Sequence, residues 1–210
     1  MKIFLYLSAA VCAYLISGLN PAIIISKPVY HKDIRECGSG NPGFTNFKRT
    51  FGNKWAWCVL MLDLAKAAVT VGFFAQLFEI YLQDYQFGAA YTGMFCMLGH
   101  AFPVWYGFKG GKGFLVLMST IWLVDWHAGL CSVAVLLLFL LATKYMSLST
   151  MLALTAGVIY LAVAGNASTE VIFMCALQVL FMICRHKSNI KKLMAGTESK
   201  FSFGGDKQKC

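Results

Sequence analysis

Long apolar stretches recur along almost the whole chain, and they constrain its fold more than any other feature. A helix that crosses the hydrocarbon core of a bilayer needs roughly 17 to 25 mostly apolar residues. Seven stretches are candidates, namely residues 3–25, 55–82, 88–107, 113–124, 127–143, 147–165 and 169–184. The fourth is short and the third to fifth are poorly separated, so five or six spans are the alternative. We expect an all-α, polytopic integral membrane protein of about seven transmembrane helices, with one domain over residues 1–210.

Composition excludes an ordinary soluble domain. Only 13% of the residues are charged and 59% are hydrophobic, and the mean hydropathy is +0.65. Soluble domains average about 25% charged residues. None of the apolar stretches resembles a signal sequence followed by a cleavage site and a polar domain, so we expect no removable leader.

The basic residues predict how the spans are oriented. Lys and Arg collect in residues 26–54, in the loop 108–113, at Lys144 and in the tail from 185, whereas the intervening turns carry acidic residues and no base. Short cytoplasmic loops are enriched in Lys and Arg. We therefore expect the N-terminus outside and the basic tail, residues 185–210, in the cytoplasm.

The formal net charge of +9 thus lies mostly on one membrane face. It can attract anionic headgroups or anionic substrates, or it can serve only as a topology signal. We expect no nucleic-acid partner, because the chain offers no soluble domain with a basic and aromatic surface. The eight cysteines form no C-x-x-C pair and most fall inside predicted spans, so we expect neither a disulfide framework nor a zinc site.

Gly38, Gly40 and Gly43 match the pattern G-x-G-x-x-G of dinucleotide-binding loops. That interpretation requires a preceding β-strand, and the charged stretch "SKPVYHKDIREC" does not have the pattern of one. Asn41 and Pro42 instead favour the start of a short helix, as N-cap and first helical residue.

The start of such a helix is suited to binding a phosphate. We expect the backbone N–H groups from Ser39 to Gly43 to face the anion, with Thr45 and Arg49 on one helical face and Asn46 beside them. The alternative is an amphipathic connector in which Arg49 faces lipid headgroups.

A second glycine-rich loop, "GFKGGKG", occupies residues 107–113. It is one residue too short for a Walker A motif and has glycine where that motif has Ser or Thr. We expect Lys109, Gly110, Gly111 and Lys112 to bind a phosphate through backbone donors and ammonium groups. The alternative is a flexible interfacial turn.

Three ionisable residues lie within or near apolar stretches. Asp63 and Lys66 are three residues apart on one helical face, and we expect a structural ion pair that supports the site. A lone histidine such as His100 is more often a hydrogen-bonded structural residue than a catalyst, but its place beside the glycine loop makes it a candidate supporting residue.

Two further polar segments lie on the same side. Ser147 and Ser149 follow Lys144, where a simple helix cap is the alternative. If the tail is helical, His186 and Asn189 share a face and Glu198 follows, although a basic membrane-surface helix would look similar. These segments together predict one site at the cytoplasmic interface.

Three segments in this order resemble the cytoplasmic motifs of the bacterial PlsY family, the acyl-phosphate:glycerol-3-phosphate acyltransferases: "GSGNPGFTNFKR", "GHAFPVWYGFKGGKG" and "RHKSNIKKLMAGTE". The resemblance runs over nearly the whole chain. It implies transfer of a fatty acyl group from acyl phosphate to the sn-1 hydroxyl of glycerol 3-phosphate, giving lysophosphatidic acid and phosphate in phospholipid synthesis. It also implies a location in the bacterial inner membrane, no cofactor, and the enzyme that supplies acyl phosphate as a candidate partner.

The resemblance also implies roles for single residues. Those at the active site are Ser39, Thr45, Arg49, Gly110, Gly111, Lys112, His186, Asn189 and either Ser147 or Ser149, with Glu198 largely structural. Four positions depart from the pattern typical of the family and bear on acyl-chain preference and local packing: Phe44, Lys48, Phe114 and Lys144.

Two questions stay open on sequence alone. The base that takes the hydroxyl proton could be His186, a serine or a substrate phosphate oxygen. The competing functions are a transporter for a phosphorylated metabolite, which would require more charges along a path through the bilayer, and a structural membrane protein.

Overall fold

The computed structural model describes residues 1–202 and Gly204, so the end of the expected basic tail, 205–210, lies outside the described residues. The described part is helical and contains no β-strand. Its helices are α1 (Lys2–Gly18), α2 (Pro21–Tyr30), η1 (Ile34–Glu36), α3 (Phe44–Phe51), α4 (Asn53–Leu82), α5 (Tyr85–Ala101), η2 (Val104–Tyr106), α6 (Phe114–Val124), α7 (Trp126–Thr143), α8 (Met146–Ala164), α9 (Thr169–Arg185) and α10 (Lys187–Met194).

Most predicted spans correspond to helices with nearly the predicted ends. The exceptions are the first, which is broken into α1 and α2, and the third, in which α5 ends at Ala101 shortly before Pro103. The first break follows from Asn20, whose side chain accepts a 3.1 Å hydrogen bond from the Ile23 N–H, and from Pro21 at the first position of α2. This pair starts a new helix inside an apolar sequence.

Four helical stretches are long and apolar enough to cross a membrane: Lys2–Tyr30, Asn53–Leu82, Trp126–Thr143 and Met146–Ala164. The pair α9 and α10, bent by 59°, gives a fifth if it is one span. The 11 residues of α6 extend only about 16 Å at 1.5 Å per residue. The number of seven spans and their orientation therefore stay predictions.

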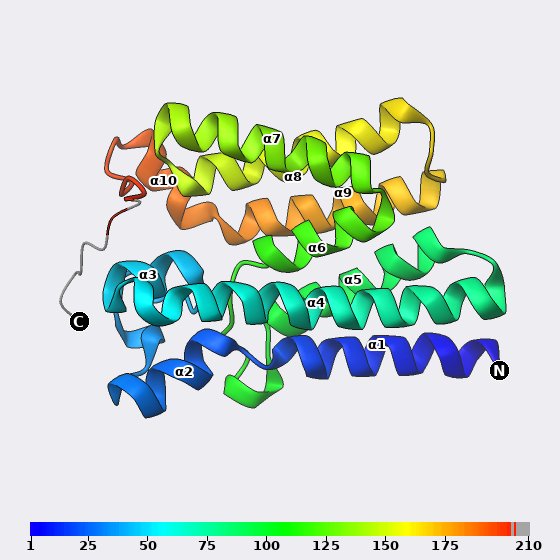
Figure 1. The fold of residues 1–210 in the computed structure, drawn as a ribbon, viewed down its shortest axis with the longest axis horizontal. Helices are drawn as coiled ribbons and strands as arrows, with labels where there is room; N and C mark the ends of the chain where they lie inside the picture. The colour runs from blue at the N-terminus through cyan, green and yellow to red at the C-terminus, as the bar shows by residue number, and fades with distance from the viewer. Residues whose placement is uncertain (203, 205–210) are drawn as a thin grey trace.

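The long helices run side by side, with α3, α10 and the turn between α7 and α8 at the end opposite the N-terminus (Figure 1). The bundle is held by α1 and α4 on α5, by α4 and α5 on α6, and by α7 on α8. The backbones approach closely where α5 meets α1, since a Cβ on Gly99 would lie 2.1 Å from the Tyr14 carbonyl oxygen. Close contact at small residues is typical of helix packing in membranes.

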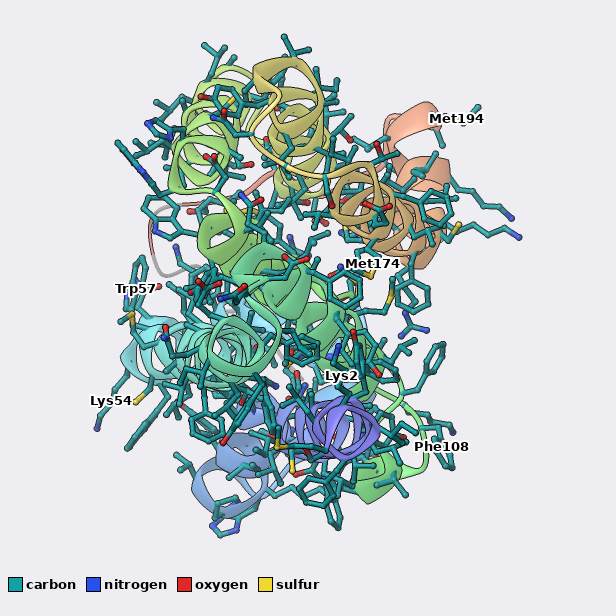
Figure 2. All side chains as sticks on the ribbon, turned by 90° about the vertical axis from the view of Figure 1, so that its right-hand side faces the viewer. Lys2, Lys54, Trp57, Phe108, Met174 and Met194 are labelled. Atoms are coloured by element: carbon teal, nitrogen blue, oxygen red, sulfur yellow. The ribbon has the colours of Figure 1, made fainter. Side chains whose placement is uncertain are left out.

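Viewed along the helices, large side chains project outward around the bundle, among them Trp57, Phe108 and Met194 (Figure 2). A separate apolar cluster lies at the end of the bundle that contains α3. In it, Phe47 and Phe51 of α3 pack with Ile23 of α2 and Val59 of α4. The Phe51 ring stacks on Tyr30 with centroids 4.1 Å apart. This cluster fixes the short helix α3, which is too short to be stable alone.

Candidate active site

The loop before α3 is organised by the side chain of Asn46. Its amide nitrogen donates to the Cys37 carbonyl at 2.9 Å, and its Oδ1 accepts from the Ser39 N–H at 2.9 Å. Cys37 is itself disulfide-bonded, contrary to the expectation that the cysteines form no disulfide framework. Gly38 has a φ of +58°, and a Cβ there would lie 2.4 Å from Asn46 Oδ1. The polar groups of Asn46 are thus directed at the loop, so Asn46 positions Ser39, and its expected role as a phosphate ligand is not supported.

The start of α3 differs from the prediction. The backbone is extended at Gly43, with φ −149° and ψ 170°, so Gly43 is the N-cap and the expectation for Asn41 and Pro42 is wrong. The Pro42 carbonyl accepts a 3.0 Å hydrogen bond from the Asn20 amide, which holds the loop outside the helix. Thr45 and Arg49 do lie one helical turn apart on α3.

The expected free N–H groups are largely used within the protein. The Gly40 N–H donates to the Cys37 carbonyl at 2.9 Å, and the Gly43 N–H donates to the Asn41 carbonyl at 3.0 Å. With the Ser39 N–H bound to Asn46, these groups satisfy the loop rather than an anion. The first loop therefore offers side chains to a ligand more than backbone donors.

The second glycine loop packs against the end of α5. The Gly110 and Gly111 N–H groups donate to the Ala101 and His100 carbonyls at 3.2 and 3.0 Å. A Cβ on Gly111 would lie 2.1 Å from His100 Nε2, so only glycine fits. The expected phosphate contacts from these two N–H groups are thus not supported, and the glycines instead let the loop approach α5 and place Lys112.

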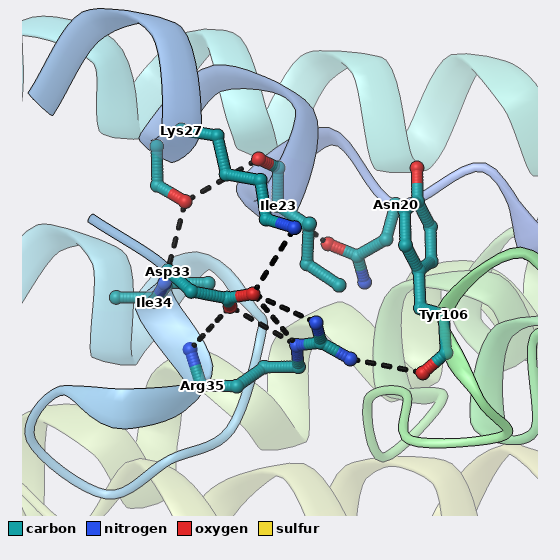
Figure 3. A network of polar contacts seen from close by, with 8 residues as sticks. Asn20, Ile23, Lys27, Asp33, Ile34, Arg35 and Tyr106 are labelled. Carbon is teal, nitrogen blue, oxygen red and sulfur yellow. Dashed lines mark hydrogen bonds and ion pairs between the residues drawn. The ribbon is translucent and has the colours of Figure 1, made fainter. Parts of the chain in front are cut away.

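A polar network joins the two loops (Figure 3). Asp33 pairs with Lys27 of α2 at 3.4 Å and with Arg35 at 2.7 Å. The Arg35 guanidinium also donates a 2.9 Å hydrogen bond to the Tyr106 carbonyl of η2. The hydrogen bond from Arg35 holds the pKa of the Asp33 carboxyl well below its usual range. This network keeps the segment before Ser39 beside the segment before Lys112.

The ion pair between Asp63 and Lys66 is present, as predicted. The Asp63 carboxylate lies 2.8 Å from Lys66 Nζ, which also donates to the Ser17 and Leu19 carbonyls at 2.8 Å. These carbonyls lie at the C-terminal end of α1, where helix carbonyls lack intrahelical partners. His100 Nδ1 is 3.3 Å from Lys66 Nζ. The ion pair thus links α1, α4 and α5 beneath the site.

The last motif meets the start of α8 in a chain of hydrogen bonds. Glu198 Oε1 accepts from Ser147 Oγ at 2.6 Å and from the Asn189 amide at 2.7 Å. The Asn189 Oδ1 in turn accepts from Lys112 Nζ. Burial lowers the pKa of Lys112 to about 8, and the Glu198 charge opposes part of this effect.

His186 lies at the bend between α9 and α10. Its Nδ1 is 2.8 Å from the Met182 carbonyl oxygen, so this nitrogen carries the proton and Nε2 is left with a lone pair when the ring is neutral. Burial lowers the pKa of His186 to about 4, so the ring is neutral at physiological pH.

These elements enclose one cavity of about 350 Å³. Its polar lining consists of Ser39, Asn41, Gly43, Thr45, Asn46, Arg49, Asp63, His100, Lys112, Ser147, Thr150, His186, Asn189, Lys192, Glu198 and Ser199. Its apolar lining comes from α3, α4, α6, α7 and α8, and includes Phe44, Leu60, Leu64, Phe114, Leu115, Met118, Val133, Leu136 and Met146. Among the described residues the Arg49 guanidinium has no hydrogen-bond or ion-pair partner, so it is available to a ligand.

Six of the predicted site residues do not line this cavity. Ser149 Oγ donates to the Tyr145 carbonyl at 2.8 Å within its own helix, so Ser147 is the serine at the site. Gly40, Lys109 and Gly110 face a neighbouring cleft, Gly111 packs on His100, and Lys66 faces Asp63 and α1.

Sequence reasoning missed Lys192 and Ser199, and it left Thr150, whose hydroxyl follows those of Ser147 and Ser149, out of the predicted site. Lys192 follows Asn189 by three residues on α10, and this spacing could have indicated that the two side chains share a helical face. No sequence signal placed Ser199, which has no regular secondary structure.

The family model for glycerol-3-phosphate acyltransferase matches residues 7–196. The chain belongs to the PlsY family of glycerol-3-phosphate acyltransferases. The glycerol-3-phosphate acyltransferase of Francisella philomiragia is 39% identical over 99% of this chain and 97% of that protein. That of Francisella tularensis subsp. novicida is 38% identical with the same coverage.

Two crystal structures of PlsY, described as an integral membrane glycerol 3-phosphate acyltransferase, are similar to this chain. The glycerol 3-phosphate form has a TM-score of 0.86 at 32% identity, covering 94% of this chain and 96% of that one. The lysophosphatidic acid form has a TM-score of 0.82 at 31% identity, covering 94% and 95%. The predicted family, helical class and multi-pass membrane location are confirmed, and this PlsY-family chain is an acyltransferase of phospholipid synthesis.

Proposed function

We propose that the chain transfers a fatty acyl group from acyl phosphate to the sn-1 hydroxyl of glycerol 3-phosphate at the cytoplasmic face of the bacterial inner membrane. The products are lysophosphatidic acid and inorganic phosphate. The observation that carries the proposal is the cavity itself, which is lined by the cationic side chains of Arg49 and Lys112 and by apolar side chains from α3, α4, α6, α7 and α8. The enzyme that makes acyl phosphate stays a predicted partner.

Two phosphate groups require cationic partners in this reaction, one on each substrate. The planar guanidinium of Arg49 suits bidentate contact with a phosphate, and the ammonium of Lys112 acts as a point charge. Lys192 lines the same cavity and adds a third positive charge. Because Glu198 binds Asn189 and not these cations directly, the positive charge is available to substrate.

The reaction requires little from the protein beyond position and charge. The hydroxyl oxygen forms an ester bond with the acyl carbonyl carbon, the bond from that carbon to the phosphate oxygen breaks, and phosphate leaves with the electron pair. Phosphate is already a good leaving group, so holding the hydroxyl near the carbonyl and neutralising the anions supply most of the acceleration.

The hydroxyl proton needs an acceptor. His186 is a poor general base because burial lowers its pKa to about 4, and efficient bases have pKa values near the working pH. A phosphate monoester, with a second pKa near 6, is better matched. A substrate phosphate oxygen therefore accepts the hydrogen bond of the hydroxyl and takes its proton as the ester bond forms.

The acyl chain occupies the apolar part of the cavity. Leu64 and Met118, on α4 and α6, and Val133 and Leu136 of α7 belong to this apolar lining. Burying methylene groups there favours binding by about 0.8 kcal/mol each. The carbonyl is thus held at the boundary between the apolar and polar linings.

The experiment compares donors and product isomers. Purified protein in nanodiscs is given glycerol 3-phosphate with either palmitoyl phosphate or palmitoyl-CoA, and the lysophosphatidic acid isomers are separated. We expect the 1-acyl product from palmitoyl phosphate only. Product from palmitoyl-CoA but not from palmitoyl phosphate would overturn the assignment of acyl phosphate as donor. A 2-acyl product formed first would overturn the assignment of the sn-1 hydroxyl as acceptor.

A further inference from the structure

The segment after α10 returns to α3 and is anchored there by Phe201. The Phe201 N–H donates a 2.6 Å hydrogen bond to the Lys144 carbonyl in the turn between α7 and α8. Phe201 is only 8% exposed, and the centre of its ring lies 6.5 Å from that of the Phe44 ring of α3. The anchor thus connects the tail to two elements that border the cavity.

Lys48 of α3 contacts both the Phe201 ring and the backbone that follows it, and we call these two contacts the clasp. Its Nζ lies 4.4 Å from the centre of the Phe201 ring and donates a 2.7 Å hydrogen bond to the Ser202 carbonyl. Lys48 is only 5% exposed. The attraction between a cation and the face of an aromatic ring is stronger when water is excluded. The clasp therefore fixes the ring and the backbone of the tail together.

Glu198 lies three residues before Phe201, in a segment without helix or strand. Three residues span at most about 10 Å, so the anchor limits how far the Glu198 carboxylate can move. The other end of the segment is fixed by the Thr197 N–H, which donates to the Lys192 carbonyl at 2.8 Å. Glu198 is thus held between two fixed points.

We propose that Phe201, clasped by Lys48, is a positioning residue for acyl transfer. It holds the Glu198 carboxylate against Ser147 and Asn189, and Asn189 in turn orients the Lys112 ammonium toward the substrate phosphate. The role of Lys112 in this proposal rests on the proposed function. Neither Phe201 nor Lys48 lines the cavity described above. In this proposal both affect the groups in the cavity through Glu198.

The first test compares single variants in lipid nanodiscs. Phe201→Ala should lower kcat/KM for glycerol 3-phosphate about tenfold, since small displacements of a positioned group can lower rates up to a hundredfold. Phe201→Tyr, which keeps the ring, should retain most activity. Ser202→Ala is the matched control, because the Lys48 ammonium binds the backbone carbonyl of Ser202, which this substitution keeps, and it should change kcat/KM less than about twofold.

The decisive test is the double variant with Glu198. If Phe201 acts through Glu198, then Phe201→Ala in a Glu198→Ala background should lower kcat/KM by less than about twofold further. An equal tenfold loss in both backgrounds would overturn the proposal. These are ratios between variants, so they can be measured with whichever acyl donor the wild type uses, and a wrong donor assignment would not alter them.

The pH profile separates positioning from a general loss of structure. The charged groups that face Lys112 are Glu198, Lys192, Arg185 and Arg49, and the neutral His186 is also near. The Glu198 carboxylate alone raises the pKa of Lys112, so its displacement in Phe201→Ala should move the alkaline limb of kcat/KM to lower pH. A lower activity with an unmoved limb would mean a structural role only and would overturn the proposal.

Discussion

Ser147 at the start of α8 donates a 2.6 Å hydrogen bond to Glu198 in the tail, 51 residues later in the chain. This contact brings the end of the last motif to a serine between α7 and α8, at the rim of the cavity. It also decides between two serines that the sequence alone could not distinguish, because Ser149 faces its own helix.

Replacement of Ser147 should therefore matter more than replacement of Ser149. In Ser147→Ala, Glu198 Oε1 keeps only the Asn189 donor, and we expect kcat/KM for glycerol 3-phosphate to fall about tenfold, as for other misplaced site groups. Ser149→Ala loses a bond to the Tyr145 carbonyl only and should stay within about twofold. Steady-state phosphate release measures both, and equal losses would contradict this assignment.

Gly111 should tolerate no side chain. A methyl group there would lie 2.1 Å from His100 Nε2, and overpacking of this kind destabilises proteins by about 1 to 3 kcal/mol. We expect Gly111→Ala to lower the melting temperature and to reduce activity, because the loop that holds Lys112 must shift. Thermal unfolding followed by Trp fluorescence measures the first effect.

The matched control is Gly72→Ala on α4, where the nearest atom to the new methyl group is 3.9 Å away. Alanine also favours a helix over glycine, so this variant should melt at the wild-type temperature or higher. A normal melting temperature and normal activity in Gly111→Ala would show that the loop does not need glycine at this position.

Much of this fold could be predicted from sequence because helix ends carry local signals. The predicted stretch 127–143 is α7 within one residue, and Asp125 caps it by accepting from the His127 and Ala128 N–H groups. The break before α2 carries such a signal as well, with Asn20 as N-cap and Pro21 as the first helical residue, but apolar length alone predicts one uninterrupted span over 3–25. The hydrogen bond from the Asn20 amide to the Pro42 carbonyl joins distant parts of the chain and could not be predicted.

The site was predictable in its side chains but not in its backbone. Thr45, Arg49, His186 and Asn189 could be grouped by helical spacing and by their common side of the membrane. The role of Gly111 could not be predicted, because its loop N–H donates to the carbonyl of His100 near the end of α5. Backbone donors in a glycine-rich loop indicate an anion site only when no protein acceptor is near.

The rate should fall at alkaline pH. The pKa of Lys112 is about 8, below the usual lysine value, so the ammonium loses its proton as the pH rises through 8 and phosphate binding weakens. We expect kcat/KM to fall above pH 8, and the kcat limb to lie higher because bound phosphate stabilises the ammonium. His186, with a pKa of about 4, should set no limb near neutrality.

Lys112→Arg tests the assignment of this limb. Arginine keeps its proton throughout this range, so the alkaline limb should move well above pH 10 in the variant, even if its maximal rate is lower. A limb that stays near pH 8 in Lys112→Arg would mean that another group titrates there.

In the proposed reaction, Arg49 binds a substrate phosphate at one end of the acyl-transfer cavity. The most direct measurement is phosphate release from palmitoyl phosphate, with and without glycerol 3-phosphate, by wild type, Arg49→Lys and Arg49→Ala in nanodiscs. We predict release only when glycerol 3-phosphate is present, partial activity in Arg49→Lys, and a loss of about a hundredfold or more in Arg49→Ala. Release by Arg49→Ala at the wild-type rate and the wild-type KM would show that Arg49 does not bind a substrate phosphate.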